Sequence, residues 1–244
     1  GLTPFYEQVA LHNAYNYSSV SYFSPENDTV CAVKQSALWC PSDPAIFPGN
    51  GIYTTPGPSG MTYTFNLTSY RGICGPWYTP VRNCNGMTGA QYQQLASNAL
   101  GILYHGSAVS LAGVSDGTSN TMLFGEYVYG RLNQGDRNCW HWWIAGNTDA
   151  IGTAMYAPNI AATRGAGTMG QVGVDPTLYS NSASLAVISQ SSEHPGGAMH
   201  AFCDGSVKFI KNTVSSWQPD FQNAQVPGWP AGVSVINTFS FGGR

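Results

Sequence analysis

Residues 193–212, EHPGGAMHAFCDGSVKFIKN, contain the side chains closest to a chemical site in this 244-residue sequence. His194 and Asp204 are an imidazole and a carboxylate of the kind used in acid–base catalysis, and Ser191 and Ser192 precede them as candidate nucleophiles. No Gly-x-Ser-x-Gly turn, which exposes the nucleophile of many hydrolases, occurs anywhere in the chain. No two histidines lie four residues apart, as a helical pair of metal ligands would; they are His12, His105, His141, His194 and His200. The sequence therefore predicts no enzyme site here.

A metal site is the second interpretation of the same stretch, because His194 could join Glu193 and Asp204 as ligands. The sequence His-Pro-Gly-Gly is more typical of a turn than of a ligand scaffold. We therefore predict a structural role, in which His194 is at least half buried and bonds a nearby backbone group. Gly196-Gly197 would let the chain turn into a strand.

The dipeptide Asp204-Gly205 lies between two short apolar segments, which is the strongest local signal of a β-hairpin. Both residues tolerate the positive φ that a type I′ turn requires. We expect this hairpin in the central sheet, with Phe209 and one of Met199 or Phe202 in the core, because register decides which face is buried.

The segment SDGTSNT, residues 115–121, is the densest cluster of side-chain oxygen atoms in a chain with twelve acidic residues. Asp116 and Asn120, with Glu126 downstream, could bind a structural calcium ion, which takes six to eight oxygen ligands. The alternative is that Asp116 caps a tight turn at Asp116-Gly117, with Thr118 or Ser119 satisfying backbone groups. No other cofactor is expected.

Six cysteines form an even set without Cys-x-x-Cys spacing: Cys31, Cys40, Cys74, Cys84, Cys139 and Cys203. This usage favours disulfides and an oxidising, extracytoplasmic compartment. Proximity in sequence favours the pairs Cys31–Cys40 and Cys74–Cys84, which leaves Cys139 with Cys203. Buried free thiols are the alternative, above all for Cys203, which lies in an expected strand.

Residues 138–147, NCWHWWIAGN, form the densest aromatic cluster. Trp140, Trp142 and Trp143, with Tyr104, could form a platform for a surface polysaccharide, although burial in the core is the commoner fate of such rings. Three Asn-x-Ser/Thr triplets, at Asn16, Asn27 and Asn66, fit the glycosylation sequon and are interpreted first as polar turns.

The surrounding elements indicate an α+β fold: a twisted antiparallel sheet with few short helices and long loops, in one domain over residues 1–244. Helical periodicity occurs at 4–16 and 87–98, and strand-like segments occur at 61–72, 99–111 and 121–130. Residues 45–62 and 157–183 are rich in Gly, Pro, Thr or Asn and predict loops. An all-β sandwich is the alternative, because few segments have helical periodicity.

Only 9% of the residues are charged, and the net charge is −3. Nucleic acid is therefore not expected as a partner, because no basic patch could neutralise phosphates. No run of about 18 apolar residues spans a membrane. A weakly charged surface rich in Tyr and Trp favours self-association.

His194, nine residues and then Asp204-Gly205 resemble the His-X9-Asp-Gly signature of bacterial prepilin-like proteins, a planctomycete-type group related to pilins and pseudopilins. The segments YEQVALHNAYNYS, LWCPSDP, SYRGICGPW, SDGTSNTMLFGE, CWHWW and SSEHPGGAMHAFCDGSVKFIKNTVSSW are similar to blocks of this family in the same order, over residues 6–217. Family precursors begin with a cleavage and methylation site and a long apolar helix. We expect that a longer precursor supplies this helix, and with it any contact with a membrane.

The resemblance implies a pilin-like head that is exported to the cell surface and assembles with copies of itself or related subunits, without catalysis. A secretion pseudopilin and a carbohydrate-binding module are the alternatives.

Overall fold

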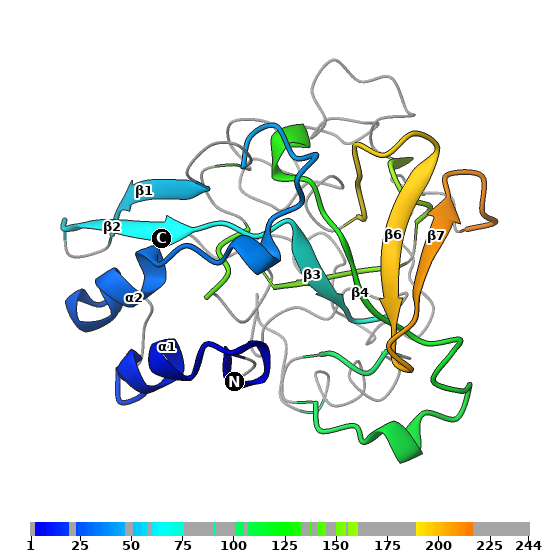
Figure 1. Cartoon of the computed structure of the whole chain (residues 1–244), viewed down its shortest axis with the longest axis horizontal. Coiled ribbons are helices and arrows are strands. Elements are labelled where there is room, and N and C mark those ends of the chain that lie inside the picture. Colours follow the sequence, from blue (N-terminus) through cyan, green and yellow to red (C-terminus); the bar gives the residue numbers. More distant parts are fainter. Residues whose placement is uncertain are drawn as a thin grey trace.

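Figure 1 shows the chain as a computed structural model. The structure describes residues 3–19, 23–46, 51–57, 60–75, 90, 101–104, 107–132, 137, 141–144, 150–154, 156–160 and 189–216. Apart from residue 90, the predicted helix at 87–98 lies outside these residues, as does most of the predicted loop at 157–183.

The described elements form a mixed five-stranded sheet and a separate two-stranded sheet, with short helices beside them. The helices are α1 (Val9–Ala14) and α2 (Asp28–Ala32), and the 3-10 turns are η1 (Thr3–Tyr6), η2 (Pro25–Asn27), η3 (Ser36–Leu38), η5 (Leu111–Gly113) and η6 (Tyr129–Arg131). The strands are β1 (Ile52–Pro56), β2 (Thr62–Asn66), β3 (Tyr70–Ile73), β4 (Met122–Glu126), β5 (Ile151–Gly152), β6 (Gly197–Phe202) and β7 (Val207–Lys211). The predicted α+β class is confirmed.

The larger sheet has the strand order β5-β3-β4-β6-β7. Its pairs are antiparallel except for β3 and β5, which run parallel, so the expectation of a wholly antiparallel sheet is wrong at this edge. The smaller sheet is the antiparallel hairpin of β1 and β2. Helix α2 packs against β2, and its Asp28 accepts a hydrogen bond from the Thr64 backbone N–H at 2.8 Å. A helix therefore covers this sheet, unlike the two bare layers of a sandwich (Figure 1).

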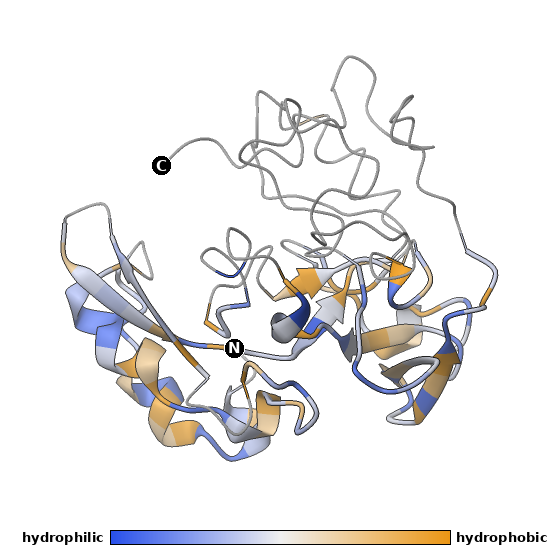
Figure 2. Cartoon of the chain, turned by 90° about the horizontal axis from the view of Figure 1, so that it is seen from above, coloured by the Kyte–Doolittle hydropathy of each residue, from blue (hydrophilic) through white to orange (hydrophobic). Residues whose placement is uncertain are grey.

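Strand β2 alternates between small polar and large aromatic residues, and this pattern selects the buried face. Tyr63 and Phe65 point into the core, where Phe65 stacks on Trp142 with ring centroids 4.4 Å apart. Trp142 is 1% exposed and also meets Phe23 edge to face. Figure 2 shows both hydrophobic and hydrophilic residues on the short helical segments.

The predicted helix at 4–16 forms in two pieces, η1 and α1, because Glu7 between them has a φ of 67°. Its expected apolar face is buried only at Leu11. Phe5 is 85% exposed and Val9 is 51% exposed. Within 99–111, the described residues contain no strand, whereas β1 lies within the predicted loop at 45–62.

Strands β6 and β7 form the expected hairpin, but its turn differs from the predicted type I′. The backbone N–H of Gly205 donates to the Phe202 carbonyl, and the N–H of Phe202 donates to the Ser206 carbonyl. Gly205 has a φ of 82°, whereas Asp204 is not among the described residues with positive φ. The loop is therefore a type I turn over Cys203 and Asp204, followed by glycine in the left-handed region.

The hairpin lies at one edge of the larger sheet, with β7 outermost. Phe202 is 5% exposed, as predicted, but Phe209 is 43% exposed, so its placement in the core is wrong. An edge strand has a neighbour on one side only, and in β7 the alternating face that carries Val207 and Phe209 remains open.

The predicted Cys31–Cys40 disulfide is wrong, because both residues are buried free thiols. Cys203 is likewise a free thiol, and the Cys74 Sγ donates to the Gly152 carbonyl at 3.1 Å. The partners proposed for these two, Cys139 and Cys84, lie outside the described residues.

The prediction that Trp142 belongs to an aromatic platform is wrong, because its ring lies in the core. Trp143 is half-buried, and its Nε1 donates to the Cys31 carbonyl. Tyr104 packs against the same core, and Trp140 lies outside the described residues.

Two of the three glycosylation candidates are wrong. Asn27 and Asn66 are 0% exposed, and their side-chain amides donate to the carbonyls of Asn16 and Gly51. Asn16 is exposed, and its Oδ1 accepts from the Ser18 N–H in a polar turn.

Gly205→Val should destabilise the protein by about 1–3 kcal/mol, because a β-branched residue resists positive φ. A Cβ at Gly205 would meet no atom within 4 Å, so the cost is one of backbone conformation alone. Gly113 is the matched control, because its φ is ordinary and its nearest atom to a new Cβ is 3.7 Å away. Urea unfolding should show little change for Gly113→Val, and an equal loss in both variants would contradict the turn assignment.

Stability should also fall on the acid side because of His141, which is 1% exposed and whose Nδ1 lies 2.9 Å from the Thr68 carbonyl. Burial and then the charge of Arg71 lower the pKa of His141 to about 3. His141 takes up its proton near pH 6.5 in the unfolded chain. The stability that depends on neutral His141 is therefore fully present above pH 6.5 and is lost progressively as the pH falls toward 3. At pH 4.5 the loss should be about 2–3 kcal/mol.

His141→Asn is the test, because Asn tolerates the φ of 70° at this position and does not titrate. The unfolding free energy of the variant should vary less between pH 7 and pH 4.5 than that of the wild type. Parallel curves for the two proteins would exclude His141 as the cause.

Candidate functional site: an apolar groove with a buried Cys–Glu–His cluster

One face of the larger sheet carries a hollow of about 730 Å³, which we call the groove. Strands β4, β6 and β7 contribute to its wall, together with the N-terminal η1 and the turn after η3. Most of its lining is apolar and includes Phe5, Leu38, Phe124, Met199 and Val207. Hollows of this size that combine apolar walls with a few polar groups are the usual form of binding sites.

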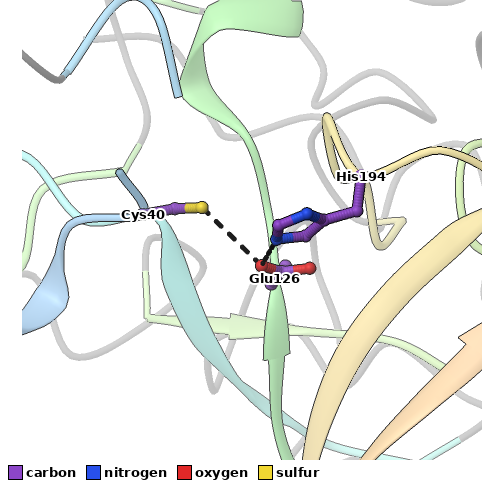
Figure 3. A group of neighbouring side chains, drawn as sticks. All are labelled: Cys40, Glu126 and His194. Atoms are coloured by element: carbon purple, nitrogen blue, oxygen red, sulfur yellow. Dashed lines mark hydrogen bonds and ion pairs between the residues drawn. The ribbon is translucent and has the colours of Figure 1, made fainter. Parts of the chain in front are cut away.

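The polar part of the groove is a cluster of Cys40, Glu126 and His194, whose side chains converge from three segments (Figure 3). The Cys40 Sγ lies 3.6 Å from Glu126 Oε1, and the His194 Nε2 lies 3.4 Å from the same oxygen. All three ligand-type atoms lie within 4.8 Å of one another. Cys40 and Glu126 are each 1% exposed, whereas the His194 side chain is 44% exposed.

Glu126 is the last residue of β4 and pairs with Tyr70 of β3. Its Oε2 accepts a hydrogen bond of 2.8 Å from the backbone N–H of Met199 in β6, which leaves Oε1 facing Cys40 and His194. A buried carboxylate is costly without such partners. Burial raises the pKa of Tyr70, and the charges of Cys40 and Glu126 beside it raise that pKa further.

The turn that carries the cysteine is held by Asp43, which is 0% exposed. Its carboxylate accepts hydrogen bonds from the backbone N–H groups of Ala45, Tyr129 and Gly130 at 3.2, 2.8 and 3.0 Å, and from the Ser69 hydroxyl at 3.2 Å. Burial raises the pKa of Asp43, whereas these four bonds lower it. The carboxylate thereby joins the turn to β4's exit and to the start of β3.

His194 is held by its neighbours in the turn that enters β6. Glu193 forms a bidentate ion pair with Arg131, at 2.8 and 3.0 Å, and Arg131 also donates to Asn159. Gly196 then reverses the chain with a φ of 83°. The hydrogen bond from Arg131 lowers the pKa of Glu193. This turn presents the imidazole to Glu126, a carboxylate rather than the backbone group that was predicted, with slightly more than half of the side chain buried.

The structure separates the other ligand sets that the sequence favoured. Glu193 is paired with Arg131, and Asp204 lies at the hairpin tip, where it accepts from Ser206, so neither joins His194. Asp116 and Asn120 form the tight turn of the alternative interpretation, in which the Asn120 amide donates to the Asp116 carbonyl.

Glu126 lies at the far end of β4 from that turn, so the calcium site formed by these three residues is wrong. An extended strand rises about 3.3 Å per residue, so the four steps of β4 from Met122 to Glu126 alone span roughly 13 Å.

Cys40 is the functional candidate that the sequence did not indicate, because proximity favoured a disulfide with Cys31. Its contact with Glu126 joins residues 86 positions apart. No local pattern reports such a contact, and the available sequence signal was an acidic residue, Glu126, at the end of an apolar strand.

The hydroxyls of the two serines near His194 accept hydrogen bonds from backbone N–H groups. The Ser191 hydroxyl accepts from the Val128 N–H at 2.9 Å, and the Ser192 hydroxyl accepts from the His194 N–H at 3.1 Å. Neither is thereby placed as a nucleophile against the imidazole.

Residues 1–216 match the model of the SBP_bac_10 family, described as a protein of unknown function (DUF1559). The chain belongs to this family. The DUF1559 proteins are a planctomycete-type, prepilin-like group, which agrees with the resemblance of the sequence blocks. No curated protein and no solved structure matches the chain. Among the described residues of this DUF1559 protein, no helix has the length and hydrophobicity needed to cross a bilayer.

Asp43→Asn should lower the unfolding free energy by about 2–4 kcal/mol, because an amide NH₂ would face backbone donors that the carboxylate now accepts. Asp116→Asn is the matched control, because Asp116 is exposed and, among the described residues, its side chain accepts one long contact of 3.4 Å, from Ser115. Chemical denaturation of both variants measures the difference, and equal stability would show that Asp43 does not hold the turn.

Proposed function

We propose that this chain is a non-catalytic, extracellular structural subunit of a type IV pilus-like filament or other cell-surface assembly, and that it associates with copies of itself or with related subunits. The observation that supports this proposal is the groove, because hydrophobic side chains at its edge are open to solvent. Phe5 is 85% exposed and Val207 is 60% exposed. Contiguous exposed apolar surface of this kind is typical of a protein–protein contact.

A second copy is the occupant that these residues favour. Phe5 protrudes beside the hollow that it helps to line, so a two-fold arrangement would let each Phe5 enter the groove of its partner. Burying an aromatic ring of this size removes about 150–250 Å² from water. The net charge of −3 on a chain with 9% charged residues supplies little repulsion between copies.

The absence of catalysis in this proposal is supported by the engaged hydroxyls of Ser191 and Ser192. The burial of Trp142 argues against the alternative of a carbohydrate-binding surface, since a sugar platform needs an open ring face.

Sedimentation velocity over a range of concentrations tests the self-association. The wild type should form dimers or larger species, and Val207→Asp should weaken association at least about tenfold, because it would place a charge in an apolar contact. Val33→Asp is the matched control, because Val33 is 38% exposed at the end of α2 and does not line the groove.

The control should associate like the wild type. A wild type that stays monomeric at every concentration, or equal weakening in both variants, would contradict a contact through the groove.

A further inference from the structure

We infer that Cys40, Glu126 and His194 form a binding site for one divalent transition-metal ion of the zinc type. A thiolate sulfur, an imidazole nitrogen and a carboxylate oxygen are the ligand types that zinc accepts in proteins. Sulfur and nitrogen ligands disfavour calcium and magnesium, which bind oxygen. Within the parts of the chain that the structure describes, this is the group of three such side chains whose ligand atoms converge.

Two of the three separations between ligand atoms, those that involve Glu126 Oε1, fit the edges of a tetrahedron around one ion. Bond lengths of about 2.3 Å to sulfur and about 2.1 Å to oxygen or nitrogen put sulfur and oxygen roughly 3.6 Å apart, and nitrogen and oxygen roughly 3.4 Å apart. The observed separations from Glu126 Oε1 are 3.6 Å to the Cys40 Sγ and 3.4 Å to the His194 Nε2. The nitrogen–oxygen separation is longer than an ordinary charge-assisted hydrogen bond of about 2.7–2.9 Å.

The ligand atoms are held in place by groups around them. Met199 N–H fixes Glu126 Oε2 at 2.8 Å and so directs Oε1 toward the cluster. Asp43 holds the turn of Cys40, and the Arg131–Glu193 ion pair holds the segment of His194. Partners of this kind orient the side chains that bind the metal and raise the affinity for it.

The electrostatics favour a cation at this point. Glu126 and Cys40 are each 1% exposed, and the thiol would lose its proton on binding, so the ion would neutralise a buried carboxylate and thiolate. Three protein ligands leave the fourth tetrahedral position for water or another donor in the groove. The site does not depend on the proposed self-association, because all three ligands come from one chain.

Cobalt(II) titration of the reduced, metal-free protein tests the inference, because a cobalt–thiolate bond gives a near-ultraviolet charge-transfer band. One equivalent should produce the band, zinc should displace the cobalt, and zinc should raise the melting temperature. Cys40→Ser should abolish the band, and His194→Ala, a change on a side chain that is 44% exposed, should weaken zinc binding at least about 100-fold.

Cys203→Ser and His12→Ala are the matched controls for thiol and imidazole, and both should bind like the wild type. The absence of a band at a large cobalt excess would overturn the inference. Undiminished affinity in His194→Ala, or loss of the band in Cys203→Ser, would also do so. Sedimentation of the same samples reports self-association separately, so one proposal can fail while the other stands.

Discussion

The Glu126 carboxylate is buried at the end of a central strand, and the surrounding segments are arranged around it. A carboxylate that is 1% exposed must find partners within the protein, and here they come from three parts of the chain. Met199 of β6 donates its backbone N–H, His194 approaches from the turn before β6, and Cys40 approaches from the turn after η3. The same constraint therefore fixes the wall of the groove and the position of its polar cluster.

Asp43, in the same turn as Cys40, is a second carboxylate that is buried and needs partners within the protein. Four donors meet its buried carboxylate, three of them backbone N–H groups that no helix or strand satisfies. The irregular segments between strands are thus held by side-chain carboxylates. This suits a chain with few helices and only twelve acidic residues, because the acids that are buried each connect several segments.

The sequence predicted the features that depend on neighbours in the chain. Asp204-Gly205 indicated the hairpin, and the apolar segment before Glu126 indicated β4, because turn chemistry and alternation are local. The exposure of Phe209 could not be predicted, since it depends on β7 being an edge strand. The partner of Cys40 lies 86 residues away, so spacing favoured the nearer Cys31 and was wrong.

The groove combines an apolar edge, suited to contact with another subunit, and a polar cluster within one chain, suited to rigidity. Electron cryomicroscopy of the native surface assembly is the most direct test of the central claim, that this DUF1559 protein is an assembling subunit. The account predicts repeating copies in contact through the groove, with a neighbour covering Phe5 and Val207. Particles in which the groove faces solvent while another surface forms every contact, or in which the protein occurs only as isolated monomers, would contradict it.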